Sequence, residues 1–219
     1  MVSASEAVPA KPLLRGVLHE AAFPVSLVVG ALLIGFSEGA RQQAAAAVFA
    51  GSVAVCFGVS ALYHRVTWAP HVRLVMRRLD HAGVYLLIAG TYTPVCLLAL
   101  EGPWRFVVLA VVSTAAGAAT ILKVAWVAAP SWLAAALGIG IGWVGVPLLP
   151  QLATQLEPAA IVLLGVGGVA YTLGAVVYAR RRPNPVPTVF GYHELFHALT
   201  IVGVACQYVA IAFFVIRPA

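Results

Sequence analysis

Two histidines near the end of the chain, His193 and His197, have the most recognisable chemistry. They belong to HELFH, residues 193–197, which has the H-E-x-x-H pattern of many zinc metalloproteases. Residues four apart lie on one helix face about one turn apart, so both imidazoles can reach one ion. A catalytic zinc takes three protein ligands and keeps a position for water. No Asp, Glu or His follows His197, so the third ligand must come from upstream.

The composition places this motif in a membrane. The chain has 219 residues, of which 62% are hydrophobic and 9% charged, and its mean hydropathy is +0.98. Soluble domains carry about 25% charged residues, so most of this chain must lie in lipid. The net charge of +6 is therefore attributed to the basic loops that membrane proteins keep in the cytoplasm. No nucleic-acid partner is expected.

Seven stretches are long and apolar enough to span a bilayer, which takes about 20 helical residues. The predicted fold is therefore all-α: a polytopic membrane protein built as a seven-transmembrane-helix bundle. The fifth stretch is the weakest helix because it contains Gly138, Gly140, Gly142 and Pro147. The predicted spans are approximately residues 21–37, 43–65, 80–100, 105–126, 131–150, 159–179 and 192–216.

The basic residues predict the orientation of the bundle. Seven spans place the two termini on opposite sides of the membrane. With the N-terminus in the cytoplasm, the inner side carries all of the 13 Lys and Arg residues except Arg41, Arg105 and Arg217. This bias follows the positive-inside rule. We therefore predict a cytoplasmic N-terminus, an outside C-terminus and a multi-pass location in the cell inner (plasma) membrane.

The N-terminal part is predicted to lie on the membrane rather than in it. Residues 1–16 lack the pattern of a cleaved signal peptide. KPLLRGVLHE, residues 11–20, reads as a short amphipathic piece on the inner surface that closes with His19 and Glu20. We therefore divide the chain into a cytoplasmic segment, residues 1–20, and one seven-helix transmembrane domain, residues 21–217.

Four ionisable side chains from three predicted spans reach the same depth of the membrane. His64 ends the second span, Asp80 begins the third, and His193 and His197 begin the seventh, all near the inner face. Ionisable residues within spans are costly and are functional candidates for that reason. His64 is thus the natural third ligand. The pattern predicts Zn²⁺ held by the three histidines, with Asp80 as general base or as the group that orients the water.

Ser60 and Glu194 each allow two interpretations. Ser60 lies one turn before His64, where its hydroxyl could bond the water, the nearby carboxylate or a substrate carbonyl. It could equally bond back to a helix carbonyl, as serines in membrane helices often do. Glu194 has the sequence position of the metalloprotease base, although it is turned about 100° from the preceding histidine. We favour a structural carboxylate at the inner interface near residues 180–182.

The remaining histidines and cysteines are assigned no ligand role. His71 is expected to be solvated in the loop between the second and third spans. His81 is expected to lie beside the site or at the interface rather than to bind the ion. The cysteines lie in apolar runs without a C-x-x-C pattern, so buried thiols are expected at Cys56, Cys96 and Cys206.

Three segments together resemble the signature of bacterial haemolysin III proteins: SALYH (60–64), RRLDHAGVYLLIAGTYTP (77–94) and GYHELFHALTIVG (191–203). KPLLRGVLHE is also similar to the N-terminal segment of that family, so the resemblance covers nearly the whole chain. The family is related to the progestin and adipoQ receptors, which include the adiponectin receptors, and more distantly to the alkaline ceramidases.

The resemblance implies seven transmembrane helices with the N-terminus inside. It implies a zinc ion held by three histidines, which fall on His64, His193 and His197. It also implies that Asp80 and Ser60 lie near the zinc-bound water. On this interpretation HELFH provides two of three intramembrane ligands and is not a complete protease site.

Several functions remain open at this stage. The first is a ceramidase-like, zinc-dependent hydrolase that cleaves an amide or ester of a membrane lipid near the inner leaflet, with Asp80 and Ser60 as catalytic residues. The second is a non-enzymatic sensor or receptor of membrane state in which the zinc is structural. A pore-forming haemolysin is disfavoured because the chain reads as a compact polytopic protein. An intramembrane protease would need a third ligand other than His64.

Overall fold

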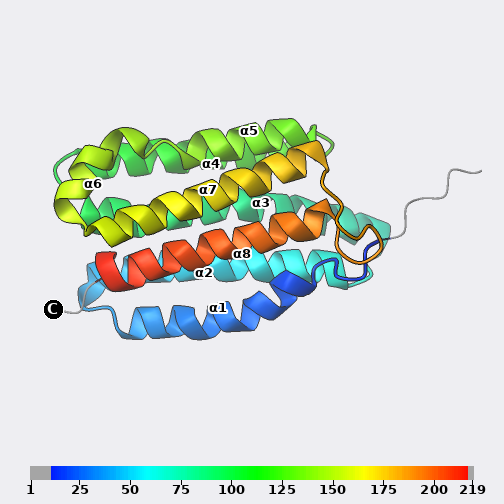
Figure 1. The fold of residues 1–219 in the computed structure, drawn as a ribbon, viewed down its shortest axis with the longest axis horizontal. Coiled ribbons are helices and arrows are strands. Elements are labelled where there is room, and N and C mark those ends of the chain that lie inside the picture. Colours follow the sequence, from blue (N-terminus) through cyan, green and yellow to red (C-terminus); the bar gives the residue numbers. More distant parts are fainter. Residues whose placement is uncertain (1–10, 217–219) are drawn as a thin grey trace, which may run out of the picture.

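Helices account for most of residues 11–216, the part of the chain that the computed structural model describes. Their axes run side by side along the long dimension of the molecule (Figure 1). This part of the chain contains no β-sheet, only an isolated bridge between Val186 and Phe190. The long helices are α1 (Val17–Gly35), α2 (Gly39–Arg65), α3 (Pro70–Pro94), α4 (Trp104–Ala125), α5 (Ser131–Gly142), α7 (Pro158–Arg180) and α8 (Tyr192–Ala210).

Short helical turns complete the spans. A π-helical turn at Val95–Ala99 extends α3, and another at Ile211–Val215 extends α8. A 3₁₀ turn, Val146–Leu148, and α6 (Leu149–Gln155) continue the path of the chain after α5. With these turns, seven stretches of residues 11–216 are long and apolar enough to cross a membrane. The predicted fold class is confirmed.

Several helix boundaries differ from the predicted spans, and two of the differences have a clear local cause. α3 begins at Pro70, whereas residues 67–79 were expected to form a loop. That expectation is wrong because hydropathy locates only the apolar part of a helix. A proline at the first helical position, followed by Leu, Met and Arg, favours a helix that extends beyond the lipid. His71 is therefore helical, although it is exposed as expected. α1 begins at Val17 after Gly16, whose φ of 83° allows a sharp turn.

The fifth span is interrupted after Gly142, within the region where the glycines predicted a weak helix. α5 ends at Gly142, and the helical path resumes only with the turn at Val146–Leu148. This span is also the least covered by other parts of the protein, since 11% of the residues in its most apolar stretch are buried. Much of its surface is therefore available to lipid.

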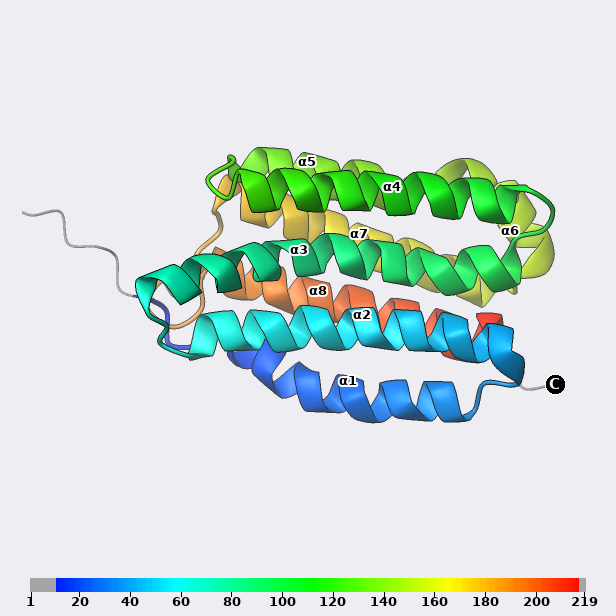
Figure 2. The same cartoon turned by 180° about the vertical axis from the view of Figure 1, so that it is seen from behind.

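The helices form successive rows across the bundle. α1 lies at one edge, α2 and α8 form the next row, α3 and α7 the one after, and α4 and α5 the opposite edge (Figures 1 and 2). The closest pairings are α7 with α8, α2 with α3, and α1 with α2. Helices α2 and α8, which carry the three predicted ligands, therefore lie at the centre of the fold.

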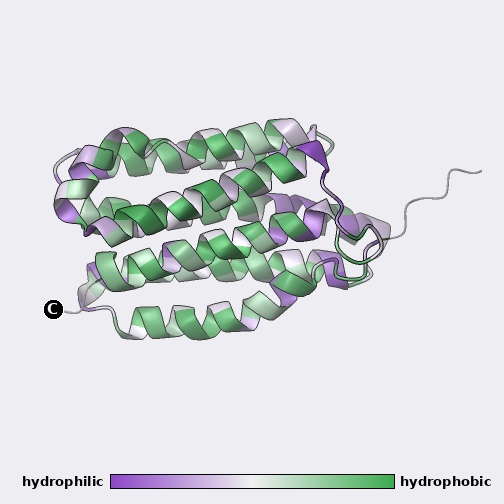
Figure 3. Cartoon of the chain, viewed as in Figure 1, coloured by the Kyte–Doolittle hydropathy of each residue, from purple (hydrophilic) through white to green (hydrophobic). Residues whose placement is uncertain are grey.

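Hydrophilic residues gather at the end of the bundle where α2 ends and α8 begins (Figure 3). The rest of the surface is largely apolar, with Ile121 71% and Phe213 67% exposed, as expected of helices that face lipid. We call the hydrophilic end the basic end, because it carries Lys11, Arg15, Arg65, Arg73, Arg77, Arg78, Lys123, Arg180, Arg181 and Arg182.

Small residues allow the central helices to approach closely. A Cβ atom added to Gly90 of α3 would lie 2.0 Å from the Ser52 hydroxyl oxygen and 3.3 Å from the Val48 carbonyl oxygen, both on α2. Gly117 of α4 has no such neighbour within 4 Å. These two helical glycines thus form a matched pair for testing how tightly α2 and α3 pack.

We predict that Gly90→Ala lowers the melting temperature of the protein purified in detergent. Overpacking of this kind costs about 1–3 kcal/mol, and here backbone as well as side chain would have to move. Gly117→Ala should melt at or above the wild-type temperature, because alanine is the better helix former. Thermal unfolding followed by size-exclusion chromatography measures both variants. Equal melting temperatures would contradict the close crossing of α2 and α3.

Candidate metal centre

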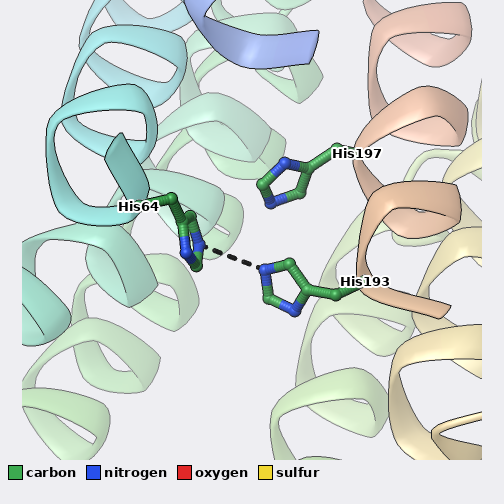
Figure 4. Close-up of side chains that lie close together, drawn as sticks. All are labelled: His64, His193 and His197. Carbon is green, nitrogen blue, oxygen red and sulfur yellow. Dashed lines mark hydrogen bonds between the residues drawn. The ribbon is translucent and has the colours of Figure 1, made fainter. Parts of the chain in front are cut away.

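Three histidines from two helices converge at the basic end (Figure 4). His64 lies in the last turn of α2, and His193 and His197 lie in the first two turns of α8. The Nε2 atoms of His64 and His193 are 3.1 Å apart, and the ring centroids of His193 and His197 are 4.6 Å apart. Each residue offers one ring nitrogen, and these nitrogens all lie within 4.8 Å of one another.

The spacing and chemistry of these nitrogens fit one transition-metal ion. Zn–N bonds are about 2.0–2.1 Å long, which puts two imidazole nitrogens on the same tetrahedral ion about 3.3 Å apart. The separation of His64 and His193 is close to this value. His64 is 7% and His197 2% exposed, so water competes little for the site. The structure thus brings together the three residues that the sequence singled out as ligands, and this buried cluster could hold a metal ion.

Asp80 and Ser60 lie beside the histidine cluster. An Asp80 oxygen is 3.7 Å from His64 Nε2. The Ser60 side chain lines the same cavity as Asp80 and acts on its carboxylate. Ser60 is buried in α2 one turn before His64, and Asp80 faces α2 from α3. Asp80 and Ser60 therefore place two polar side chains next to the histidines.

A fourth histidine, His19, packs against the cluster and was not predicted there. Its ring stacks on that of His197 with centroids 3.9 Å apart and an angle of 6° between the planes. His19 is 3% exposed, so its assignment to a surface piece is wrong. The cause is that α1 starts at Val17 and turns His19 inward. The signal was available, since His19 directly precedes an apolar span at the same predicted depth as the other three.

Residues 11–16, which we call the N-terminal strap, run across the basic end. Backbone N–H groups of Leu13 and Leu14 donate to the carbonyl oxygens of Thr188 and Val189, at 3.0 and 3.1 Å. A Cβ atom on Gly16 would lie 2.5 Å from the Cβ of His64, so the strap touches a ligand residue directly. The strap therefore covers the histidines at this end of the bundle.

Glu194 anchors the strap to α8. One carboxylate oxygen accepts the Gly191 N–H at 2.8 Å and caps the helix, while the other pairs with Arg15. Glu194 is 1% exposed, so a structural role is supported, but its partner is Arg15 and not residues 180–182 as expected. Both carboxylate oxygens of Glu194 thus have partners, one in the backbone at the start of α8 and one in the strap. Burial, together with the charge of Arg15, lowers the pKa of Lys11 at the start of the strap.

A narrow cavity of about 80 Å³ leads from the histidines into the bundle. It reaches helices that carry no predicted ligand, including α4 and α5. The sequence did not indicate which residues line the cavity on the side of α4 and α5, because they lie on separate helices and form no motif. Besides His19, Ser60, Asp80 and the ligand residues of α8, the cavity is lined by Cys56, His81, Tyr85, Lys123, Tyr178 and Phe196, among others.

A sequence model of the family described as Haemolysin-III related matches residues 8–208. The chain belongs to the haemolysin III family. It is 30% identical to Hemolysin-3 of Bacillus cereus over 201 residues, which cover 88% of this chain and 87% of the relative. It is 26% identical over 170 residues to the Hemolysin-3 homolog of Bacillus subtilis (strain 168), covering 78% and 76%.

Plant proteins extend this haemolysin III relationship. Heptahelical transmembrane protein ADIPOR2 of Oryza sativa subsp. japonica is 33% identical over 183 residues, which cover 75% of this chain and 79% of the relative. Its name agrees with the seven candidate spans of residues 11–216. The resemblance drawn from the three signature segments, and its link to adipoQ-type receptors, are thus confirmed.

We predict that metal removal destabilises this haemolysin III protein by disconnecting α2 from α8. A metal that binds only the folded state adds to its stability, so chelation should lower the melting temperature by several degrees and added zinc should restore it. His64→Ala should remove this response. His71→Ala, which changes an exposed histidine of α3, should respond as the wild type does. A full chelator response in His64→Ala would contradict the proposed ligand set.

Proposed function

We propose that this haemolysin III protein is a zinc-dependent hydrolase that cleaves an amide or ester bond of an acyl lipid within the membrane. The observation that carries the proposal is a cluster of three protein ligands, counted over residues 11–216, with a carboxylate beside it. Structural zinc sites are closed by four protein ligands, whereas catalytic sites have three and keep a position for water. His64, His193 and His197 with Asp80 alongside match the catalytic type.

Each side chain of the site would have its own role in the reaction. The three histidines would hold the zinc ion, which when bound supplies a Lewis acid and lowers the pKa of water. Asp80 would accept a proton from the attacking water as general base. Ser60, which lies beside Asp80, would orient its carboxylate by a hydrogen bond. The water oxygen bonds to the acyl carbon, the C–N or C–O bond breaks, and the proton passes to the leaving amine or alcohol.

The distribution of charge supports a location for the reaction. With the basic end in the cytoplasm, as the positive-inside rule favours, the protein is a multi-pass protein of the cell inner (plasma) membrane. The cluster then lies near the head groups of the inner leaflet, where the amide and ester bonds of lipids are found. Membrane lipids are therefore the proposed substrates.

The test is release of fatty acid by the purified, zinc-containing protein in vesicles that contain N-oleoylethanolamine, N-oleoylglycine or ceramide. We predict release from at least one of these lipids, measured by mass spectrometry. Asp80→Asn should reduce kcat about 100-fold or more, because general-base catalysis contributes at least that factor. His71→Ala is the control variant and should retain full activity, since it is exposed and remote from the cavity.

The zinc content of each variant separates a catalytic from a structural metal. Asp80→Asn that keeps its zinc but loses fatty-acid release supports the hydrolase. Zinc bound by the wild type with no release from any of the three lipids would contradict it, and would favour a non-enzymatic sensor in which the metal is structural. Equal release by Asp80→Asn and the wild type would contradict the role assigned to Asp80.

A further inference from the structure

Lys123 is a buried cation on a helix that carries no candidate metal ligand. It lies in the last turn of α4, is 4% exposed and lines the same cavity as Asp80 and His197. Its ammonium group donates to the Ala129 carbonyl oxygen at 2.9 Å and reaches the Val127 carbonyl oxygen at 3.5 Å. An ammonium group has three donors, so one remains for another partner.

The charge of Lys123 is not neutralised by the part of the chain that the structure describes. Over residues 11–216, no carboxylate oxygen lies within 4.0 Å of its nitrogen. The closest ionisable neighbours that act on it electrostatically include Arg77, which repels it. A buried charge without a counter-charge is costly, and such groups normally pair with an anion. Within the cavity, that anion has to come from a ligand.

His81 stands beside Lys123 and is also incompletely satisfied. Its Nδ1 atom is buried without a hydrogen-bond partner among residues 11–216. His81 lines the cavity, and the charges of Lys123 and Arg77 both act on it. It follows Asp80 directly in α3, so the two side chains point about 100° apart. Asp80 faces His64 of α2, which leaves His81 on the side of α4.

The cavity thus has two chemically different regions. α3 lies between α2 and α4 (Figure 2), so the histidine cluster and Lys123 approach the cavity from opposite sides. On one side the metal cluster and Asp80 would act on an acyl carbonyl. On the other side a cation and an unpartnered imidazole nitrogen offer partners to an anion. The volume of about 80 Å³ corresponds to about three water molecules, which suits a carboxylate better than a bulky head group.

We propose that Lys123 and His81 form a subsite for a compact anionic group next to the scissile bond, so that the preferred substrates are acyl lipids with a small anionic head, such as N-acyl amino acids. This inference rests on the proposed hydrolase function for its catalytic consequence, but the anion subsite itself does not require turnover. Lys123 would pair with the carboxylate of the head group while the acyl chain extends among the apolar walls formed by α5 and α7.

The test compares two lipids that differ only in this charge, N-oleoylglycine and N-oleoylglycinamide. We predict that wild-type protein prefers the carboxylate by kcat/KM and that Lys123→Met reduces this preference about tenfold or more, as expected for a buried hydrogen bond to a charged group. Lys123→Arg should retain most of the preference. Arg180→Met removes one exposed positive charge of the same end and should retain it fully.

A purely structural role of Lys123 in holding the α4–α5 turn predicts a different result. Both substrates would then lose kcat/KM in the same proportion in Lys123→Met, and the preference would persist, which would overturn the proposal. If Lys123→Met instead relieves inhibition by oleate and leaves the preference unchanged, the subsite binds the product carboxylate and the proposed substrate class is wrong.

Equilibrium binding separates this proposal from the hydrolase function. Binding of N-oleoylglycine is measured to Asp80→Asn protein with and without Lys123→Met, so that turnover does not interfere. Weaker binding by about tenfold or more in the double variant, with N-oleoylglycinamide binding less affected, supports the subsite even if no lipid is hydrolysed. Equal weakening for both lipids would overturn it.

Discussion

The burial of polar side chains inside an apolar bundle is the constraint on which the rest of this structure depends. A buried polar group without a partner costs about 1–3 kcal/mol, and a buried charge costs more. Most of the polar groups at the basic end are accordingly matched. Glu194 has Arg15 and the Gly191 N–H, and His64 lies against both His193 and Asp80. Among the groups left without a full set of partners are His197, His81 and Lys123, to which a metal ion or a substrate anion is assigned.

This constraint also accounts for the N-terminal strap. The imidazoles of α2 and α8 would face the aqueous phase at the basic end if nothing covered them. The strap lies over them through Gly16, which approaches His64, and through Arg15, which reaches the buried carboxylate of Glu194. Breaking a buried ion pair from one side costs about 3–5 kcal/mol, so the strap is firmly attached. The glutamate of HELFH thus positions the start of the helix that presents both histidines.

The sequence was sufficient to predict the number of spans, the three-histidine cluster and its two polar neighbours, because each depends on hydropathy, helical spacing and depth in the membrane. His64 could be joined to His193, 129 residues away, and to His197 because all three fall at the same predicted depth. The partner of Glu194, the inward position of His19 and the cavity position of Lys123 could not be predicted in this way. They depend on how the strap crosses the bundle and on which faces of α1 and α4 turn inward, and both follow from tertiary packing. The start of α3 was misplaced because hydropathy does not mark the end of a helix that continues beyond the lipid.

The central claim is that one zinc ion is held by histidines from α2 and α8. Its most direct test is the metal content of untagged protein purified in mild detergent, determined by mass spectrometry and combined with the zinc X-ray absorption spectrum. The account predicts about one zinc per chain with imidazole nitrogens as the protein ligands, lost in both His64→Ala and His197→Ala and retained in Glu194→Gln. Zinc retained in full by His64→Ala would contradict the three-histidine site and return HELFH to the protease-type interpretation.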